Sequence, residues 1–133
     1  MIVRQFEPGD MDEVRRIHGL CGFDYVLPDF SGKEFFSGRV VQDRNGIGMA
    51  AFLRLSAEAF LIADPQWKTP AWRMEALRQI QAICTGDARN AGVAEVEAWI
   101  PPEIESKFGK RLVKMGWQRA RDGWKSYSFP VNK

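Results

Sequence analysis

One stretch of the chain, residues 57–100, constrains the fold more than any other. It opens with a largely apolar run at 57–63, continues with a long helical pattern at 70–90, and closes with a second strand-like run at 93–100. A strand, a helix and a strand joined in this order form a crossover, which connects two parallel strands of one sheet. The stretch therefore predicts an α/β domain built around a parallel pair of strands.

Strand and helix patterns also flank this stretch. A tight turn at Asn45-Gly46 joins two of the strands, because both residues tolerate a positive φ. The expected elements outside the stretch are, in chain order, a strand at 2–6, a helix at 11–20, strands at 39–43 and 47–55, a helix at 102–115, and a hairpin of strands at 117–119 and 124–129. The full order is β-α-β-β-β-α-β-α-β-β, within a single domain that covers residues 1–133.

The composition fits one small domain outside the membrane. The chain has 133 residues, and none of its apolar runs reaches the roughly 20 residues that a membrane helix needs. Residues 1–10 carry charges and do not resemble a signal peptide, so we expect a cytoplasmic protein. Cys21 and Cys84 lie far apart and are expected as buried thiols. A Cys/His metal site is not expected, because His18 is the only histidine.

The charges are distributed unevenly along the chain. Residues 1–106 hold 11 basic and 16 acidic side chains, whereas residues 107–133 hold 8 basic and 1 acidic. Such a basic quarter could face the phosphates of a cofactor or of nucleic acid. It could equally be a solvated helix face, formed by Lys107, Lys110, Arg111 and Lys114 opposite the apolar side of the helix at 102–115.

Three local sequences add to the order of elements: Val3-Arg4-Gln5-Phe6 followed by Pro8-Gly9-Asp10, Phe60-Leu61-Ile62-Ala63-Asp64-Pro65 before a helix, and Met115-Gly116-Trp117 after one. With that order, they resemble the GNAT superfamily of N-acetyltransferases, and the chain also resembles small phage-encoded members. The resemblance implies a mixed central sheet of about six to seven strands flanked by helices. It also implies acetyl-CoA as the acyl donor and an amine as the acceptor.

The loop that binds the pyrophosphate of acetyl-CoA in this family has the pattern Gln/Arg-x-x-Gly-x-Gly/Ala. Lys68 matches its first position, Ala71 its first glycine and Arg73 its second, so no glycine remains. One interpretation is that Lys68, Thr69 and Arg73 donate to phosphate beside the helix N-terminus, with Ala71 and Trp72 in the site. The other is an ordinary capped helix start, with Trp72 in the core.

Catalytic candidates also follow from the resemblance. The backbone N–H groups of Ile62 and Ala63 would polarise the thioester carbonyl. Glu58, at the start of the preceding strand, lies about where the family places a general base, and Glu95 on the neighbouring strand is a second candidate. The alternative is that Glu95 belongs to a solvent-facing or salt-bridged strand surface.

The general acid is harder to assign. Many family members have a tyrosine about five residues before the end of the late helix, a place that Leu112 holds here. Tyr127 on the last expected strand is the nearest candidate proton donor.

Two function classes therefore stay open. The first is an N-acetyltransferase that uses acetyl-CoA and an amine, with no metal and no membrane contact. The second is a non-catalytic binding or structural module that kept the fold and lost CoA chemistry. The sequence leaves a nucleic-acid partner and a homodimer open and favours neither.

Overall fold

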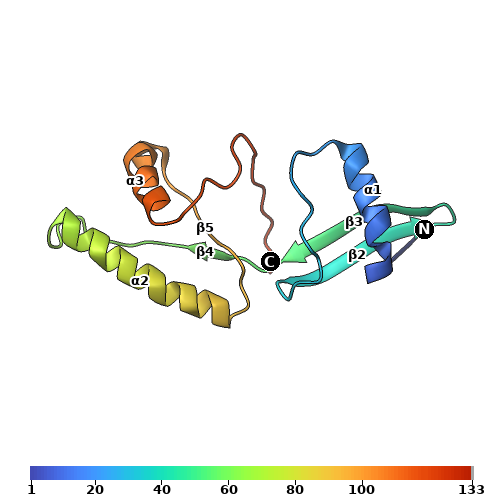
Figure 1. The fold of residues 1–133 in the computed structure, drawn as a ribbon, viewed down its shortest axis with the longest axis horizontal. Coiled ribbons are helices and arrows are strands. Elements are labelled where there is room, and N and C mark those ends of the chain that lie inside the picture. Colours follow the sequence, from blue (N-terminus) through green and yellow to red (C-terminus); the bar gives the residue numbers. More distant parts are fainter. Residues whose placement is uncertain (133) are drawn as a thin grey trace. The chain divides into compact units, whose positions relative to one another are not determined.

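A computed structural model describes residues 1–132 of the chain, which fold as an α/β protein (Figure 1). The predicted class is confirmed, and the order of elements agrees with the prediction as far as the last helix. In chain order the elements are β1 (Ile2–Gln5), the short 3-10 helix η1 (Pro8–Asp10), α1 (Met11–Cys21), β2 (Phe35–Asp43), β3 (Gly46–Arg54), β4 (Ala57–Ala59), α2 (Pro70–Asn90), β5 (Val96–Ala98) and α3 (Pro102–Lys114).

The strands of the described chain form two small sheets rather than the single sheet that was expected. One sheet has the order β1-β2-β3, and the other consists of β4 and β5. The prediction of about six to seven strands in one sheet is wrong for residues 1–132, which contain these five. The crossover strands do pair with each other, but each keeps only three residues.

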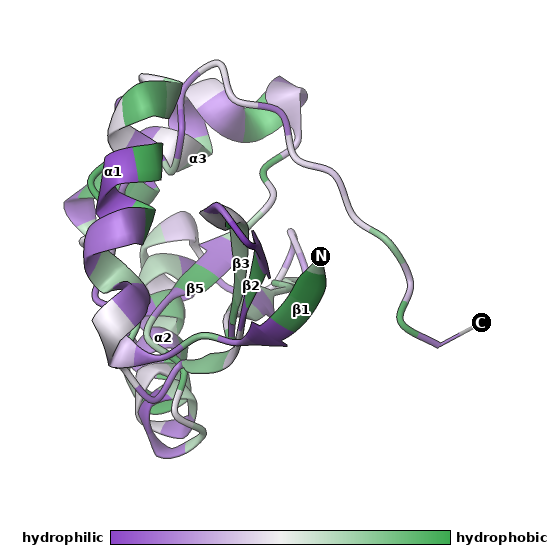
Figure 2. Ribbon diagram, turned by 90° about the vertical axis from the view of Figure 1, so that its right-hand side faces the viewer, coloured by the Kyte–Doolittle hydropathy of each residue, from purple (hydrophilic) through white to green (hydrophobic). Residues whose placement is uncertain are grey.

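The expected hairpin at 117–119 and 124–129 is also absent from the described residues. Trp117, the first residue of that hairpin, instead closes α3, because its N–H donates to the carbonyl of Leu112 at 3.0 Å. After α3 the described chain runs without helix or strand (Figure 2), and the Tyr127 side chain is 93% exposed. Alternating apolar residues therefore do not make a strand where no neighbouring strand offers hydrogen bonds.

The residues gather into two compact units. The first consists of Met1–Ala57 and Ala82–Val96, and the second of Glu58–Gln81 and the described residues from Glu97 onward. The boundary between them passes through β4, α2 and β5.

The sheet of the first unit is an antiparallel meander. Val40 pairs with Arg4 of β1 on one side and with Ala50 of β3 on the other. The turn between β2 and β3 is the predicted Asn45-Gly46, in which Gly46 has φ 118° and Asn45 N–H donates to the Asp43 carboxylate at 2.7 Å. This turn prediction is confirmed, because the left-handed backbone falls on the glycine.

One face of this sheet forms the buried centre of the first unit. Val40 is 0% exposed and Val14 of α1 is 6% exposed, and α1 contacts β3. Phe30 from the loop after α1 stacks on Phe52 of β3, with ring centroids 3.7 Å apart and planes 4° from parallel. Gly38 lies opposite Phe52, and a Cβ atom there would lie 3.0 Å from the Phe52 ring. The glycine therefore leaves the space that the stacked rings fill.

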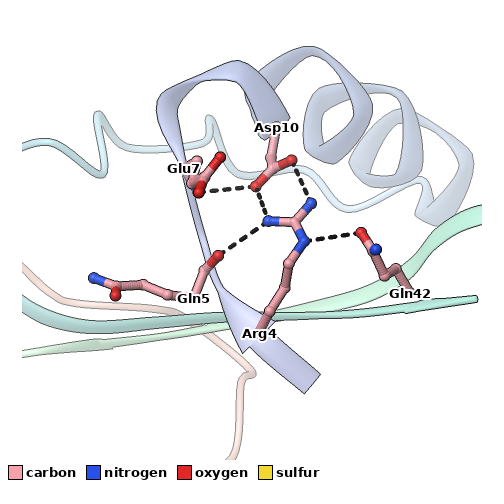
Figure 3. Close-up of polar contacts among 5 residues, drawn as sticks. All are labelled: Arg4, Gln5, Glu7, Asp10 and Gln42. Atoms are coloured by element: carbon pink, nitrogen blue, oxygen red, sulfur yellow. Dashed lines mark hydrogen bonds and ion pairs between the residues drawn. The ribbon is translucent and has the colours of Figure 1, made fainter. Parts of the chain in front are cut away.

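A polar cluster fastens the start of α1 to the same face (Figure 3). The guanidinium of Arg4 donates to both carboxylate oxygens of Asp10 at 2.8 Å and to Gln42 Oε1 at 2.8 Å. The backbone N–H of Glu7 donates to the same Asp10 carboxylate at 2.8 Å. The Arg4 hydrogen bonds, followed by the Glu7 bond, lower the pKa of Asp10 to about 2.

Both cysteines are exposed free thiols, so the prediction of buried thiols is wrong. Cys21 ends α1, next to Gly22 in the left-handed conformation, and Cys84 lies on α2, in which no residue is buried. The hydrophobic pattern of α2 predicted the helix correctly but not the burial of its side chains, since Ile83 is 68% exposed.

Candidate functional site

The segment after β4 turns sharply at Asp64 and Pro65 before it enters α2. Asp64 accepts a hydrogen bond on its side chain from Gln66 N–H at 2.9 Å, and on its carbonyl from Trp67 N–H at 3.2 Å. Proline at the second position of such a turn already has the required φ, and aspartate at the first position suits it too. The Asp-Pro pair therefore stops the extended chain and brings residues 66–69 to the helix N-terminus.

The first turn of α2 is capped by Thr69. Its hydroxyl accepts a hydrogen bond from Trp72 N–H at 3.2 Å, and its carbonyl accepts one from Arg73 N–H at 3.0 Å. Pro70 has no N–H to satisfy. Within the described chain, Ala71 is left as the first-turn residue whose N–H has no protein acceptor. The cap matches the interpretation of an ordinary helix start, with one backbone donor left for an anion. The part of that interpretation that placed Trp72 in the core is wrong, because Trp72 is 59% exposed.

Arg73 holds the loop in shape. One nitrogen of its guanidinium donates to the carbonyl of Trp67 at 3.0 Å and to that of Lys68 at 3.1 Å. Lys68 has φ 56°, the one non-glycine positive φ among the described residues, and its ammonium lies 5.7 Å from the centre of the Trp72 ring. A left-handed lysine costs about 1–2 kcal/mol relative to an ordinary backbone conformation. The Arg73 hydrogen bonds help to offset that cost.

The end of α3 is fixed to α2 within the second unit. Gly116, with φ 96°, ends the helix, and its N–H donates to the Val113 carbonyl at 3.1 Å. The Trp117 indole then donates to Gln81 Oε1 at 2.8 Å, and Gln81 Nε2 donates to the Met115 carbonyl at 3.4 Å. Met115-Gly116-Trp117 is the helix-closing triplet expected from the sequence. In addition, its hydrogen bonds to Gln81 join α3 to α2.

A cavity of about 320 Å³ opens between the segment after β4, the first half of α2 and α3. Its walls are mainly apolar, and three of its residues are charged, Asp64, Arg73 and Arg111. The volume lies at the lower end of the range typical of small-molecule sites. The lining residues are Leu61, Ile62, Ala63, Asp64, Trp67, Pro70, Arg73, Met74, Ala76, Leu77, Ile80, Phe108 and Arg111.

The cavity brings together three of the residues predicted to bind the cofactor, Ile62, Ala63 and Arg73. Four others, Lys68, Thr69, Ala71 and Trp72, lie in the adjoining loop and first turn of α2 but not in the cavity wall.

Sequence reasoning missed Arg111, which was placed on the solvated face of α3. Arg111 and Phe108 both line the cavity. Side chains three residues apart lie on the same side of a helix, and this spacing from Phe108 was the signal that could have revealed Arg111.

The predicted catalytic side chains lie outside this wall. Glu58 is exposed on β4, three residues before the first lining residue, Leu61. Glu95 forms an ion pair with Arg54, which matches the salt-bridged alternative. Tyr127 lies in the irregular segment after α3.

Two further findings bear on the kind of site. Across residues 1–132, no group of three or more histidine, cysteine, aspartate and glutamate side chains is arranged to hold a metal ion. In the same residues, no helix has both the length and the apolar character that crossing a bilayer requires.

Family models, curated proteins and solved structures were each compared with the chain, and none matches it.

Proposed function

We propose that this chain is a GNAT-type N-acyltransferase, which transfers an acetyl group from acetyl-CoA to an amine. One observation carries the proposal. The cavity combines the segment that follows a strand (Ile62 and Ala63), the start of the next helix (Arg73) and a cation from the late helix (Arg111). A thioester with an anionic tail needs these three kinds of group: backbone donors for its carbonyl, cations for its phosphates, and apolar walls between them.

The donors at the start of α2 fit a pyrophosphate. Arg73 and Arg111 are permanently charged, and Lys68 adds an ammonium in the adjoining loop. The helix N-terminus contributes a partial positive charge, and the Ala71 N–H is directed outward from it without a protein acceptor in the described chain. Side-chain charge would thus replace the close backbone approach that glycines provide in the family loop.

The reaction would follow from this placement. The neutral amine nitrogen attacks the thioester carbon, and the N–H groups of Ile62 and Ala63 stabilise the negative charge that develops on the carbonyl oxygen. The carbon–sulfur bond then breaks, which yields an amide and the thiolate of CoA. The proton lost by the amine passes to the Glu58 carboxylate directly or through a water. Glu58 is about 10 Å along an extended chain from Leu61. A single water spans only two hydrogen bonds of about 2.8 Å each, so over this distance more than one water would have to carry the proton.

The proposal keeps two subsidiary roles as predictions. Glu95 stands as a second candidate base, although Arg54 already binds its carboxylate. Tyr127 stands as the candidate acid for the leaving thiolate, because Leu112 has no proton to give. Tyr127 is 93% exposed and is not among the residues that line the cavity. Unless it reaches the leaving sulfur, the thiolate leaves unprotonated and turnover is slow.

Turnover with a panel of amines tests this function. The purified chain is mixed with acetyl-CoA and small amines, polyamines or peptides with free N-termini, and acetylated product and free CoA are measured by mass spectrometry. We expect at least one class of amine to be acetylated, with Glu58→Gln lowering the rate about 100-fold and Glu97→Gln leaving it near the original rate. Equal rates in wild type and Glu58→Gln would contradict the role of Glu58.

A second candidate function is a non-catalytic module with the same fold. The observation that favours it is the engagement of Thr69 and Arg73 in the loop's own hydrogen bonds, as in an ordinary helix cap. Its basic residues on and after α3 would then face a partner such as nucleic acid. Retention on DNA that falls steeply with salt, together with no acetyl-CoA binding, would support this candidate over the enzyme.

A further inference from the structure

A row of cations on α3 leads away from the cavity. Arg111 lines the cavity, and Lys107, Lys110 and Lys114 follow at spacings of three or four residues, so all four share one side of the helix. All four are exposed, and none forms an ion pair among residues 1–132. Residues 107–118 contain no acidic side chain that could neutralise them. A positively charged surface therefore extends along about 10 Å of helix beside the cavity.

The cavity itself carries little net charge. Its charged lining residues are Arg73, Arg111 and Asp64, so one carboxylate offsets one of the two guanidiniums. The phosphates of free CoA carry roughly four negative charges, most of which would have to be met by Lys68 in the adjoining loop or by solvent. A phosphopantetheine arm attached to the serine of a protein has only one phosphodiester group. The cavity wall balances the charge of that group and not the charge of CoA.

From these two features we propose that the acyl donor is a thioester on a phosphopantetheine arm of an acidic protein, which binds the α3 cations. The inference rests on the proposed function and changes only the donor. The phosphate of the arm lies at Arg73 and Arg111, and its pantetheine follows the apolar wall. The thioester lies at Ile62 and Ala63, where the amine displaces the sulfur as a thiolate that stays on the arm. Free acetyl-CoA shares this arm and binds more weakly, because it lacks the acidic protein.

The backbone before Asp64 can bind the two amide groups of the pantetheine. Leu61, Ile62 and Ala63 line the cavity outside any strand, and their backbone groups have no hydrogen-bond partner in the described part of the chain. With two N–H groups used by the thioester, the Leu61 N–H and three carbonyl groups remain for the amides, which an apolar wall alone would leave unsatisfied. Ile62 is 94% exposed, so the thioester stays open to the amine.

Nucleic acid is the other polyanion that fits a basic helix surface. Its phosphates would bind the α3 cations, but it would leave the cavity without an occupant. Arg111 belongs to both features, because it lines the cavity and lies in one row with Lys107 and Lys114. A ligand that combines an arm for the cavity with an acidic surface for α3 uses both, and it therefore fits better than nucleic acid.

Calorimetric titration of the full chain with an acidic carrier protein tests the proposal. Three ligands are compared at about 50 mM salt: acetyl-CoA, the carrier without its arm, and the same carrier with acetyl-phosphopantetheine. Joining two weak contacts in one ligand strengthens binding about 100-fold or more when both can be made at once. We expect the loaded carrier to bind at least about ten-fold more tightly than either other ligand. A loaded carrier that binds no more tightly than acetyl-CoA would overturn the proposal.

Charge reversal locates the surface that binds the carrier. Lys107→Glu with Lys114→Glu should weaken the loaded carrier at least about ten-fold and acetyl-CoA less than about three-fold, since neither residue lines the cavity. Lys33→Glu with Arg44→Glu reverses two exposed cations elsewhere and should change neither affinity. Equal weakening by the two pairs would show that net charge alone drives binding, which overturns the proposal. Lys107→Gln with Lys114→Gln gives the same comparison if the glutamate pair does not fold.

The outcomes separate this inference from the proposed function. If acetyl-CoA binds and the loaded carrier binds no better, the inference fails and the acyltransferase proposal stands. If neither binds, both fail. A DNA duplex titrated in parallel tests the other polyanion, and a duplex that binds more tightly than the loaded carrier would overturn the inference in favour of nucleic acid.

Discussion

The indole nitrogen of Trp117 donates a hydrogen bond of 2.8 Å to Oε1 of Gln81. It connects a residue three positions beyond the end of α3 to the middle of α2, and Gln81 Nε2 donates to the Met115 carbonyl at 3.4 Å. The two helices that supply Arg73 and Arg111 to the cavity are therefore linked by side chains outside it. This link therefore helps to hold the helices that carry the two arginines.

Gln81→Leu should destabilise the chain by about 1 kcal/mol, because it leaves the part-buried indole N–H of Trp117 without this acceptor. Urea unfolding measures the change. Gln79→Leu is the matched control, since Gln79 is exposed and bonds only within its own helix, to Glu75. Equal losses in the two variants would show that the Trp117 bond adds no stability.

Thr69 separates the structural and functional interpretations of the loop. Thr69→Ala should cost about 1 kcal/mol, because Trp72 N–H loses its cap, whereas Thr69→Asp retains a capping oxygen and should keep the stability near wild type. The aspartate also places a negative charge at the proposed phosphate site, so it should weaken acetyl-CoA binding at least about ten-fold. A Thr69→Asp chain that is stable and binds acetyl-CoA normally would place the phosphates elsewhere.

Gly38 is expected to tolerate no larger side chain. Gly38→Val would push into the ring of Phe52 and the Cβ of Phe6, which lies 3.3 Å from the position of an added Cβ, and should cost about 1–3 kcal/mol. Gly48→Val on β3 is the control, because nothing lies within 4 Å of a Cβ at that position. Thermal unfolding compares the two, and a Gly38 variant as stable as the Gly48 variant would contradict the packing described.

The Arg4–Asp10 pair predicts how stability depends on pH. The folded state lowers the pKa of Asp10 from 3.8 to about 2, so the ionised carboxylate stabilises the fold above pH 3.8. That contribution is lost as the pH falls through about 2. Asp10→Asn should therefore be less stable than wild type near neutral pH.

The melting temperatures of wild type and Asp10→Asn should converge as the pH is lowered. Asp12→Asn is the control, because the Asp12 side chain is 97% exposed and pairs only with Arg15 of the same helix. A gap between wild type and Asp10→Asn that is constant from pH 7 to pH 2 would contradict the ion-pair explanation.

The helices were largely predictable because their ends are marked by local chemistry. α2 begins at Pro70 after Thr69 and ends at Asn90, as expected, with Gly92 at φ 79° just beyond it. A helix cap, and a glycine with positive φ at a helix end, depend only on residues that are close in the sequence. Both can therefore be predicted from the sequence alone. The Asn45-Gly46 turn was predictable for the same reason.

Strand length was not predictable in the same way. Residues 57–63 are largely apolar, but only Ala57–Ala59 form a strand, because the pairing depends on a partner 39 residues away along the chain. The hairpin expected at 117–119 and 124–129 is absent for a related reason. Trp117, its first residue, donates its N–H to the Leu112 carbonyl at the end of α3 instead. Pattern alone does not reveal such competition between a cap and a strand.

The site was predictable only where a strand end meets a helix start. Ile62, Ala63 and Arg73 were identified there from the family resemblance, and the structure places all three in one cavity. Arg111 was missed, because a charge next to the apolar side of a helix can belong to either face. Its position became clear only from the packing of α3 beside α2.

Calorimetric titration with acetyl-CoA tests the central claim, an acyl-CoA site formed by Ile62, Ala63, Arg73 and Arg111, most directly. We expect wild type to bind with a Kd below about 1 mM, and Arg111→Met to bind at least about ten-fold more weakly through loss of one cation. Lys110→Met removes the same charge from the neighbouring residue outside the cavity wall and should bind as wild type does. Absence of binding to wild type at millimolar acetyl-CoA, or equal weakening by both variants, would contradict the account.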